Sequence, residues 1–399
     1  DRYISTLSTS VDSWIIDGKK VQSTQKPTIV SSTLTWEKVT TLDLGLDARF
    51  FNDALGVTFD WYNRTTSDIL TTANLPATLG ADAPYENMGT IQTKGWELAI
   101  DYRHTFKNGL HFGVTASVAD DKTEVTKWTY NTKIPSYGAT GWWDKSAYKE
   151  GMVLGDIWGL QFDRFLTEDD FNADGSLKAG LPDQTKVFPA GYQFAPGDVL
   201  YKDLDNNGEI VKQTNTNDKG DLSVIGNALP RLQFGLNLDA AWKGFDISMF
   251  FQGVAKRKLW AAGNQVLPGF TTGEPFYKGA EDYWTPENTD AFYPRPMDYK
   301  QSASGNYSVN DRYLLNMAYL RLKTFTVGYS LPKVWLSKFK VQGLRVYFTG
   351  ENLFTIDGVK PAIDPEIGIR TASGKSDQRN FGRSYPYQKT VSFGIQLSL

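Results

Sequence analysis

The chain has 399 residues, of which 40% are hydrophobic and 22% charged, so its composition is that of a folded protein and excludes a largely disordered one. A net charge of −3 argues against a nucleic-acid partner bound through phosphate neutralisation, and the absence of cysteine excludes disulfides and thiolate metal sites. The 14% aromatic content and the 36 glycines are typical of an all-β outer-membrane chain. No apolar run approaches the ~18 residues of a membrane helix, whereas a barrel strand needs only about 9 to 11 residues.

Residues 1–34 are rich in serine and threonine and keep no sustained period, so we expect a loop. After Trp36, apolar and polar residues alternate over short stretches, which is the pattern of a strand with one apolar face. The first two stretches, 42–50 and 55–62, flank the turn Asn52-Asp53 and predict a hairpin. The predicted strands are, in chain order, 42–50, 55–62, 96–103, 112–118, 232–242, 247–251, 325–331, 345–354 and 391–399.

The last of these stretches shows the pattern most clearly. Val391, Phe393 and Ile395 fall on one face, and that face carries no charge. Tyr385 and Tyr387 lie about one strand length before the C-terminus, where a membrane barrel has an aromatic girdle. We therefore expect this strand, and the others of the same design, to face lipid.

The connections between the predicted strands alternate between short and long. The longest are 120–228, which has short strand-like pieces and is expected to fold on itself, and 259–317. An up-and-down membrane barrel has tight turns on one side and large loops on the other. About nine crossings then place the C-terminus on the periplasmic side and the N-terminus among the extracellular loops. The predicted fold class is all-β, a transmembrane antiparallel up-and-down β-barrel.

An odd number of about nine strands predicts two free sheet edges. Unpaired backbone N–H and C=O groups cost several kcal/mol each in lipid, so an open sheet cannot lie alone in a bilayer. The edges must therefore pair with strands from elsewhere. Asp1-Arg2-Tyr3 is no start for a secreted precursor, so we expect a mature chain, a truncated one, or one piece of a larger protein.

Seven motifs between residues 34 and 399 carry a family resemblance. They are Leu34-Thr35-Trp36-Glu37-Lys38; Asn87-Met88-Gly89 with Lys94-Gly95-Trp96-Glu97-Leu98; Pro196-Gly197-Asp198 with Tyr201-Lys202-Asp203-Leu204-Asp205-Asn206-Asn207-Gly208 and Ile225-Gly226-Asn227; Tyr283-Trp284-Thr285-Pro286-Glu287-Asn288 with Tyr293-Pro294-Arg295; Tyr319-Leu320-Arg321-Leu322-Lys323; Gly328-Tyr329-Ser330-Leu331-Pro332; and Gly350-Glu351-Asn352-Leu353-Phe354. Together they resemble the C-terminal half of SusC/RagA-like TonB-dependent outer-membrane transporters. One departure is the final residue, Leu399, where many such chains end on an aromatic residue.

The resemblance implies a 22-stranded barrel with an N-terminal plug domain, preceded by a TonB box. Residues 35–399 would then be the C-terminal part of the barrel, about nine strands, and residues 1–34 an extracellular loop segment. The implied function is TonB-dependent import of oligosaccharides or oligopeptides across the bacterial outer membrane, without catalysis. The implied partners are the N-terminal part of the same transporter, a SusD-like surface lipoprotein, TonB, the substrate and the lipid bilayer.

An acidic loop is the candidate metal site. Asp203, Asp205 and Asn207, followed by Gly208, match the first half of a calcium-binding loop, in which alternate oxygen ligands converge. The twelfth position holds Thr214 instead of glutamate. The other candidate ligands of a Ca²⁺ ion in this 203–221 loop are Glu209, Asp218 and Asp221. The alternative is an Asx-rich turn held by its own hydrogen bonds, and a poorer match lies at Asp170, Asn172, Asp174 and Gly175.

Five aromatic residues in the long loops are candidate substrate contacts, because sugar rings stack on such side chains and peptides can be gripped by them. They are Trp142, Trp143, Trp260, Tyr283 and Trp284. The alternative is that they pack the loops into a fixed shape.

The polar faces of the strands should line the lumen, because a charge on the lipid side costs up to about 2 to 4 kcal/mol. The expected lumen residues are Asp43, Asp47, Glu97, Asp101, Gln233, Asn237, Asp239 and Glu351. Catalysis is not expected, since the two histidines, His104 and His111, flank a tight turn. Two alternatives remain open: a non-transporting receptor or adhesin barrel, and a soluble all-β carbohydrate-active enzyme with its apolar faces turned inward.

Overall fold

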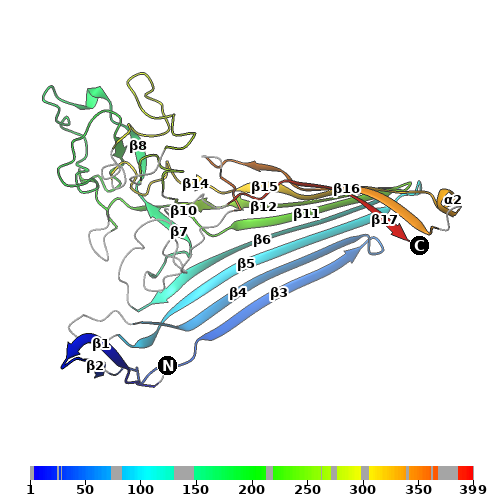
Figure 1. The fold of residues 1–399 in the computed structure, drawn as a ribbon, viewed down its shortest axis with the longest axis horizontal. Coiled ribbons are helices and arrows are strands. Elements are labelled where there is room, and N and C mark those ends of the chain that lie inside the picture. Colours follow the sequence, from blue (N-terminus) through cyan, green and yellow to red (C-terminus); the bar gives the residue numbers. More distant parts are fainter. Residues whose placement is uncertain are drawn as a thin grey trace.

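One antiparallel sheet dominates the fold. The computed structural model describes residues 4–24, 27, 29–72, 83–129, 148–212, 219–261, 263–270, 276–297, 305–337, 341–360, 363–366 and 385–398. In this part of the chain nine strands form a single sheet in the order β17-β16-β15-β12-β11-β6-β5-β4-β3 (Figure 1). The strands are β3 (Lys38–Phe50), β4 (Leu55–Thr72), β5 (Tyr85–Thr105), β6 (His111–Trp128), β11 (Arg231–Trp242), β12 (Phe245–Lys256), β15 (Tyr319–Ser330), β16 (Gly343–Asp357) and β17 (Thr390–Ser398). The predicted all-β, up-and-down strand order is confirmed, and β3 and β17 form the two open edges.

Several strands are longer than the alternation predicted. β4 continues to Thr72 and β5 has 21 residues, about twice what a tilted strand needs to cross a bilayer. The extension 63–72 is rich in threonine and has no apolar alternation, but its backbone pairs with residues 85–94 of β5. Threonine favours the pleated conformation, and ladder hydrogen bonds hold the extension without an apolar face. The alternation therefore marked only the part of β4 and β5 that is nearer the tight turns.

The register places the apolar residues of all nine strands on one face. Leu46 lies opposite Phe59, Phe59 opposite Leu98, and Leu98 opposite Val118. At the two edges this face is open, with Leu44 60% and Phe393 82% exposed. A soluble enzyme would bury these side chains in a shared core. Exposed apolar rows on a sheet of this size are instead the surface that lipid would cover.

The expected lumen residues lie together on the opposite face. Asp47 pairs with Thr58, Glu97 with Asp60, and Asp101 with Gly56, all residues of the polar rows. Asp43 lies opposite Tyr62 of β4, and the remaining members follow the same alternation in β11 and β16. Each strand therefore presents one apolar and one polar side, as the period of two requires.

The two ends of the sheet differ. The tight turns, the short helix α2 (Lys333–Leu336) and the end of β17 lie at one end, and the long connections gather at the other (Figure 1). The tight-turn end carries exposed aromatic side chains at Phe51, Phe106, Trp242 and Phe245. Membrane barrels carry such a band of aromatic side chains where the barrel meets the membrane–water interface. No helix in the described ranges is long and apolar enough to cross a membrane.

Residues 1–34, predicted to be a loop, contain a hairpin. β1 (Thr9–Ile16) pairs with β2 (Lys19–Thr24) around Asp17 and Gly18, whose φ angles are 49° and 75°. Two successive positive φ values define the type I′ turn that fits a two-residue hairpin, and Asp-Gly is a preferred sequence for it. The Asp17-Gly18 pair was therefore the signal for this hairpin.

Candidate functional site

The long connections fold into a compact body, which we call the loop region: the described residues within 148–228 and 258–317. It contains the short strands β7 (Asp156–Gly159), β8 (Phe162–Phe165), β9 (Val199–Tyr201), β10 (Ser223–Asn227), β13 (Lys258–Leu259) and β14 (Leu315–Asn316), and the 3-10 turn η4 (Glu168–Asp170). One apolar core surrounds Leu160, Val199 and Ile210, and another surrounds Leu267 and Tyr313. The expectation that 120–228 folds on itself holds for the described residues from 148 onward, whereas residues 120–128 continue strand β6 of the sheet.

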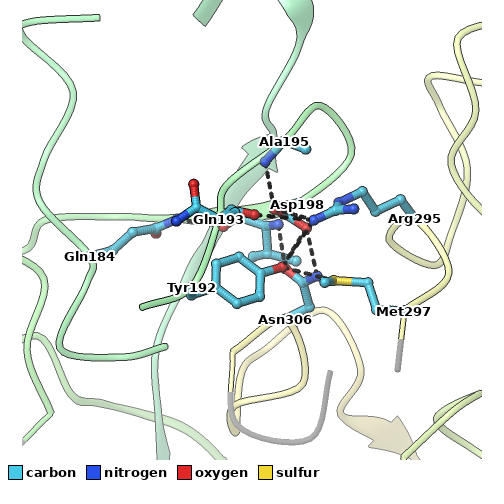
Figure 2. Close-up of polar contacts among 9 residues, drawn as sticks. Gln184, Tyr192, Gln193, Ala195, Asp198, Arg295, Met297 and Asn306 are labelled. Carbon is cyan, nitrogen blue, oxygen red and sulfur yellow. Dashed lines mark hydrogen bonds and ion pairs between the residues drawn. The ribbon is translucent and has the colours of Figure 1, made fainter. Parts of the chain in front are cut away.

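A buried carboxylate joins the two halves of the loop region (Figure 2). The Asp198 side chain is fully buried and accepts hydrogen bonds from Arg295 Nε at 2.7 Å, Tyr192 Oη at 2.9 Å and Asn306 Nδ2 at 3.0 Å. Its other oxygen accepts from the backbone N–H of Ala195 at 2.9 Å. Burial, and then the neighbouring Asp198 carboxylate, raise the pKa of Tyr192, which therefore remains a donor. The first half supplies the anion and the second half supplies Arg295 and Asn306.

Gly197, next to this carboxylate, has no acceptable substitute. Its φ of +90° lies in the left-handed region, and a Cβ atom there would come within 2.5 Å of the Trp284 ring. The Gly197 carbonyl also accepts from the backbone N–H of Arg295 at 3.0 Å. The motifs at 196–198 and 283–295 therefore meet in space.

The acidic loop brings together three of the candidate metal ligands. Carboxylate oxygens of Asp203, Asp205 and Asp221 all lie within 4.8 Å of one another. Asp221 is buried, and its oxygens accept from the N–H groups of Leu204 and Val211, at 2.7 Å each. Local desolvation, and then the neighbouring Asp203 and Asp221 carboxylates, raise the pKa of Asp205. Oxygen atoms gathered from two segments of the loop are the ligands that a hard cation such as Ca²⁺ takes.

The other described candidate ligands have other contacts. Glu209 pairs with Lys186. Asn207 stays at the cluster but acts as a donor there, since its Nδ2 donates to Asp205 at 3.0 Å while its side-chain oxygen accepts from the N–H of Glu209 at 2.7 Å. Asp218 lies outside the described residues. At the poorer match, Asp170 forms a bidentate pair with Arg164, with distances of 2.6 and 2.7 Å, so it is engaged structurally.

The candidate aromatic residues fall into three groups. Trp260 is 2% and Trp284 7% exposed, so these two pack the cores, which was the alternative interpretation for them. Tyr283 is 40% exposed and lines a pocket. Trp142 and Trp143 lie outside the described residues.

The pocket that contains Tyr283 has a volume of about 510 Å³. Its lining includes Phe276, Tyr277, Tyr293, Pro294 and Met297, none of which was a candidate substrate contact in the sequence, although Tyr293 and Pro294 belong to a family motif. Backbone hydrogen bonds from Trp284 N to Tyr293 O, at 3.0 Å, and from Tyr293 N to Asp282 O, at 2.9 Å, place Tyr283 beside Tyr293. The signal for this pocket in the sequence was the high density of aromatic residues and prolines between residues 268 and 297.

The histidines form no catalytic group. His111 Nε2 lies 3.6 Å from Asp239, and its Nδ1 lies 3.1 Å from the Thr105 hydroxyl, while His104 packs between Tyr102 and Phe106. Both stand at the tight-turn end, far from the loop region (Figure 1). A nucleophile, a base and an orienting group do not meet at either of them.

The sheet has one exposed apolar face and one polar face. Aromatic residues lie at its tight-turn end and a folded loop region at the other. These features together define a segment of an outer-membrane β-barrel receptor. The sequence profile of the family described as TonB dependent receptor-like, beta-barrel matches residues 4–353. The chain belongs to this family, which places it in the bacterial outer membrane. The family consists of receptors and transporters, so the prediction that the chain is not an enzyme is confirmed.

Individual relatives agree with this assignment. TonB-dependent receptor P3 of Formosa agariphila is 27% identical over 96% of this chain and 36% of its own length. TonB-dependent receptor SusC of Bacteroides thetaiotaomicron is 24% identical over 96% of this chain and 34% of its own length. The structure of the RagAB peptide importer in its open-open state matches with a TM-score of 0.68 and 20% identity, over 100% of this chain and 38% of that chain. The chain thus spans about a third of the length of the proteins it matches, and the suspected SusC/RagA resemblance is confirmed.

Proposed function

We propose that this chain forms the C-terminal wall and the main extracellular loops of a SusC-type transporter, which imports oligosaccharides or oligopeptides with energy supplied through TonB. A SusD-like surface lipoprotein would close over the loop region. Substrate would be captured there, and displacement of the plug would open the path along the polar face of the wall. No covalent bond is made or broken in this cycle.

The observation that supports this proposal most strongly is the two-sided sheet with open edges. β3 and β17 each present unpaired backbone groups, and Leu44 and Phe393 on these edges face outward. Because unpaired N–H and C=O groups cost several kcal/mol each in lipid, these edges need partner strands. We propose that the remaining strands of the same transporter provide them. The tight-turn end and the end of β17 would then face the periplasm.

The test uses the full-length gene in its native bacterium. Deleting it should abolish growth on one class of oligosaccharide or oligopeptide, and complementation should restore it. A protonophore should stop uptake while surface binding of the same substrate persists, because import and not capture requires TonB energy. Binding with no energised uptake would instead support the non-transporting receptor or adhesin.

We also propose that Asp203, Asp205 and Asp221 hold a Ca²⁺ ion that fixes the 203–221 loop. The convergence of their oxygens supports it. Such an ion would offset the repulsion between the carboxylates and leave the backbone contacts of Asp221 in place. In the purified full-length transporter, millimolar Ca²⁺ should protect this loop from protease and EDTA should reverse the effect.

A matched pair of variants completes this test. Asp205→Asn should remove the protection by Ca²⁺, whereas Asp174→Asn should keep it, because Asp174 only caps Ser176 in a separate exposed turn. Equal protease cleavage of the wild type with and without Ca²⁺ would leave the loop as an Asx-rich turn.

A further inference from the structure

The aromatic pocket of the loop region distinguishes between the two substrate classes. Its floor is formed by the rings of Tyr293 and Tyr307, which are both 4% exposed, and by Pro294. Phe276 and Tyr277 stand at its rim and are 63% and 40% exposed. The volume of about 510 Å³ is within the range of small-ligand sites.

The pocket is built on rigid parts of the loop region. The Tyr293 hydroxyl donates to the backbone oxygen of Val266 at 3.0 Å, so the ring is fixed and its polar atom is already engaged. Met297, another lining residue, accepts a hydrogen bond at its sulfur from the Tyr192 hydroxyl, which also binds the buried Asp198 carboxylate (Figure 2). The walls are therefore held before a ligand arrives, which lowers the entropic cost of binding.

Apart from the tyrosine hydroxyls, the polar side chains among the described lining residues are few, and they lie at the edge of the pocket. Among the described lining residues, Lys278 and Glu281 are the charged ones, and both are exposed. A sugar ring carries hydroxyl groups around its whole circumference, and each one loses water without a partner when it enters an apolar enclosure. An apolar side chain loses no hydrogen bond there. The adjacent cation and anion at the edge complement the polar main chain and the charged ends of a short peptide.

We propose that this pocket binds an apolar side chain of an imported oligopeptide, so that peptides rather than oligosaccharides are the substrate class. The inference rests on the proposed import function and deepens it. The ring faces of Tyr277 and Tyr283 contact the side chain, and Lys278 and Glu281 contact the flanking peptide groups. Tyr283 thus contributes its ring and not its hydroxyl.

The experiment uses the full-length transporter with its surface lipoprotein, purified in detergent, and measures binding by calorimetry. The probes are the peptide Gly-Phe-Leu-Gly, its polar counterpart Gly-Ser-Asn-Gly, and maltohexaose. We expect Gly-Phe-Leu-Gly to bind at least tenfold more tightly than either of the others. Tighter binding of maltohexaose, with loss of that binding in Tyr283→Ala, would overturn the proposal.

Three variants locate the site. Tyr283→Ala should weaken binding of Gly-Phe-Leu-Gly by about tenfold, as expected for an aromatic contact in a pocket. Tyr283→Phe should retain wild-type affinity, because only the ring is used. Trp14→Ala removes an aromatic residue of β1 that is 75% exposed and lies outside the pocket, so affinity should stay within twofold. Equal losses in Tyr283→Ala and Trp14→Ala would overturn the assignment to this pocket.

A parallel measurement of energised uptake separates this inference from the import function. Uptake of oligosaccharides by the wild type, without peptide binding, would overturn the peptide assignment and leave import standing. Peptide binding at Tyr283 without any protonophore-sensitive uptake would support the pocket and contradict import.

Discussion

Arg295 Nε donates a hydrogen bond to the carboxylate of Asp198 over 2.7 Å, although 97 residues separate the two in the chain. Asp198 is fully buried, and Arg295 is about a quarter exposed. The same carboxylate takes donors from Tyr192, Ala195 and Asn306. This pair therefore helps to join two long loops, which also meet where the Leu160 N–H donates to the Val309 carbonyl at 2.9 Å and in the core that contains Val199 and Trp284.

Removing the anion should loosen the loop region without unfolding the sheet. We expect Asp198→Ala to destabilise the loop region by about 3 to 5 kcal/mol, because Arg295 and the other donors lose a buried partner. Protease cleavage should rise within 160–210 and 280–297, while heat-modified gel migration of the barrel stays unchanged. Glu124→Gln, at an exposed pair with Lys122, is the control and should have little effect. Loss of the folded barrel in Asp198→Ala would contradict the inference that Asp198 stabilises the loop region and not the sheet.

The close approach of Gly197 to Trp284 should make this glycine irreplaceable. In Gly197→Ala, the alanine must adopt a strained positive φ and its Cβ must displace the Trp284 ring. In Gly180→Ala, only the positive φ is strained, because a Cβ at Gly180 has nothing within 4 Å. We expect Gly180→Ala to cost about 1 kcal/mol and Gly197→Ala clearly more. Tryptophan fluorescence and protease resistance of the loop region measure the difference. Equal destabilisation by the two substitutions would mean that the close contact with Trp284 adds no cost to the substitution at Gly197.

Neighbouring residues of β3 should respond in opposite ways to a charge. Leu44→Arg places a guanidinium on the apolar face and should destabilise the barrel by about 2 to 4 kcal/mol. Asp43→Arg places the same group on the polar face and should cost much less. Urea titration of the full-length transporter in liposomes measures both. Similar costs at the two positions would contradict the assignment of the faces.

Acid should weaken the loop region partly through Asp170. Hydrogen bonding from Arg164 lowers the pKa of this carboxyl from 3.8 to about 2. A lowered pKa contributes stability that is present above pH ~4 and lost as the pH falls toward 2. Because Arg164 is 42% exposed, solvent screening reduces the contribution to roughly 1 kcal/mol.

The check is a comparison of acid titrations. Protease susceptibility of the loop region should rise less steeply between pH 4 and pH 2 in Asp170→Asn than in the wild type, because the variant has already lost the ion pair. Parallel curves would show that Asp170 titrates at its ordinary pKa.

The sequence by itself determined the nine-stranded sheet of this protein and which of its faces is apolar. Side chains alternate across a strand with a period of two, so Leu42, Leu44 and Leu46, and later Val391, Phe393 and Ile395, marked the strands and their apolar face. Short turns such as Asn52-Asp53 indicated which consecutive strands pair. The strand extensions and the β1–β2 hairpin were missed because their backbone pairing needs no apolar alternation.

Only the tertiary structure decided what the long loops do. Asp198, Gly197, Trp284 and Arg295 carry no periodicity, and their contacts join segments about a hundred residues apart. The same holds for Tyr283, which is open in a pocket, while its neighbour Trp284 is buried in a core. Local pattern reports the direction of a side chain relative to its own strand, whereas burial in an irregular loop depends on which distant segment packs against it.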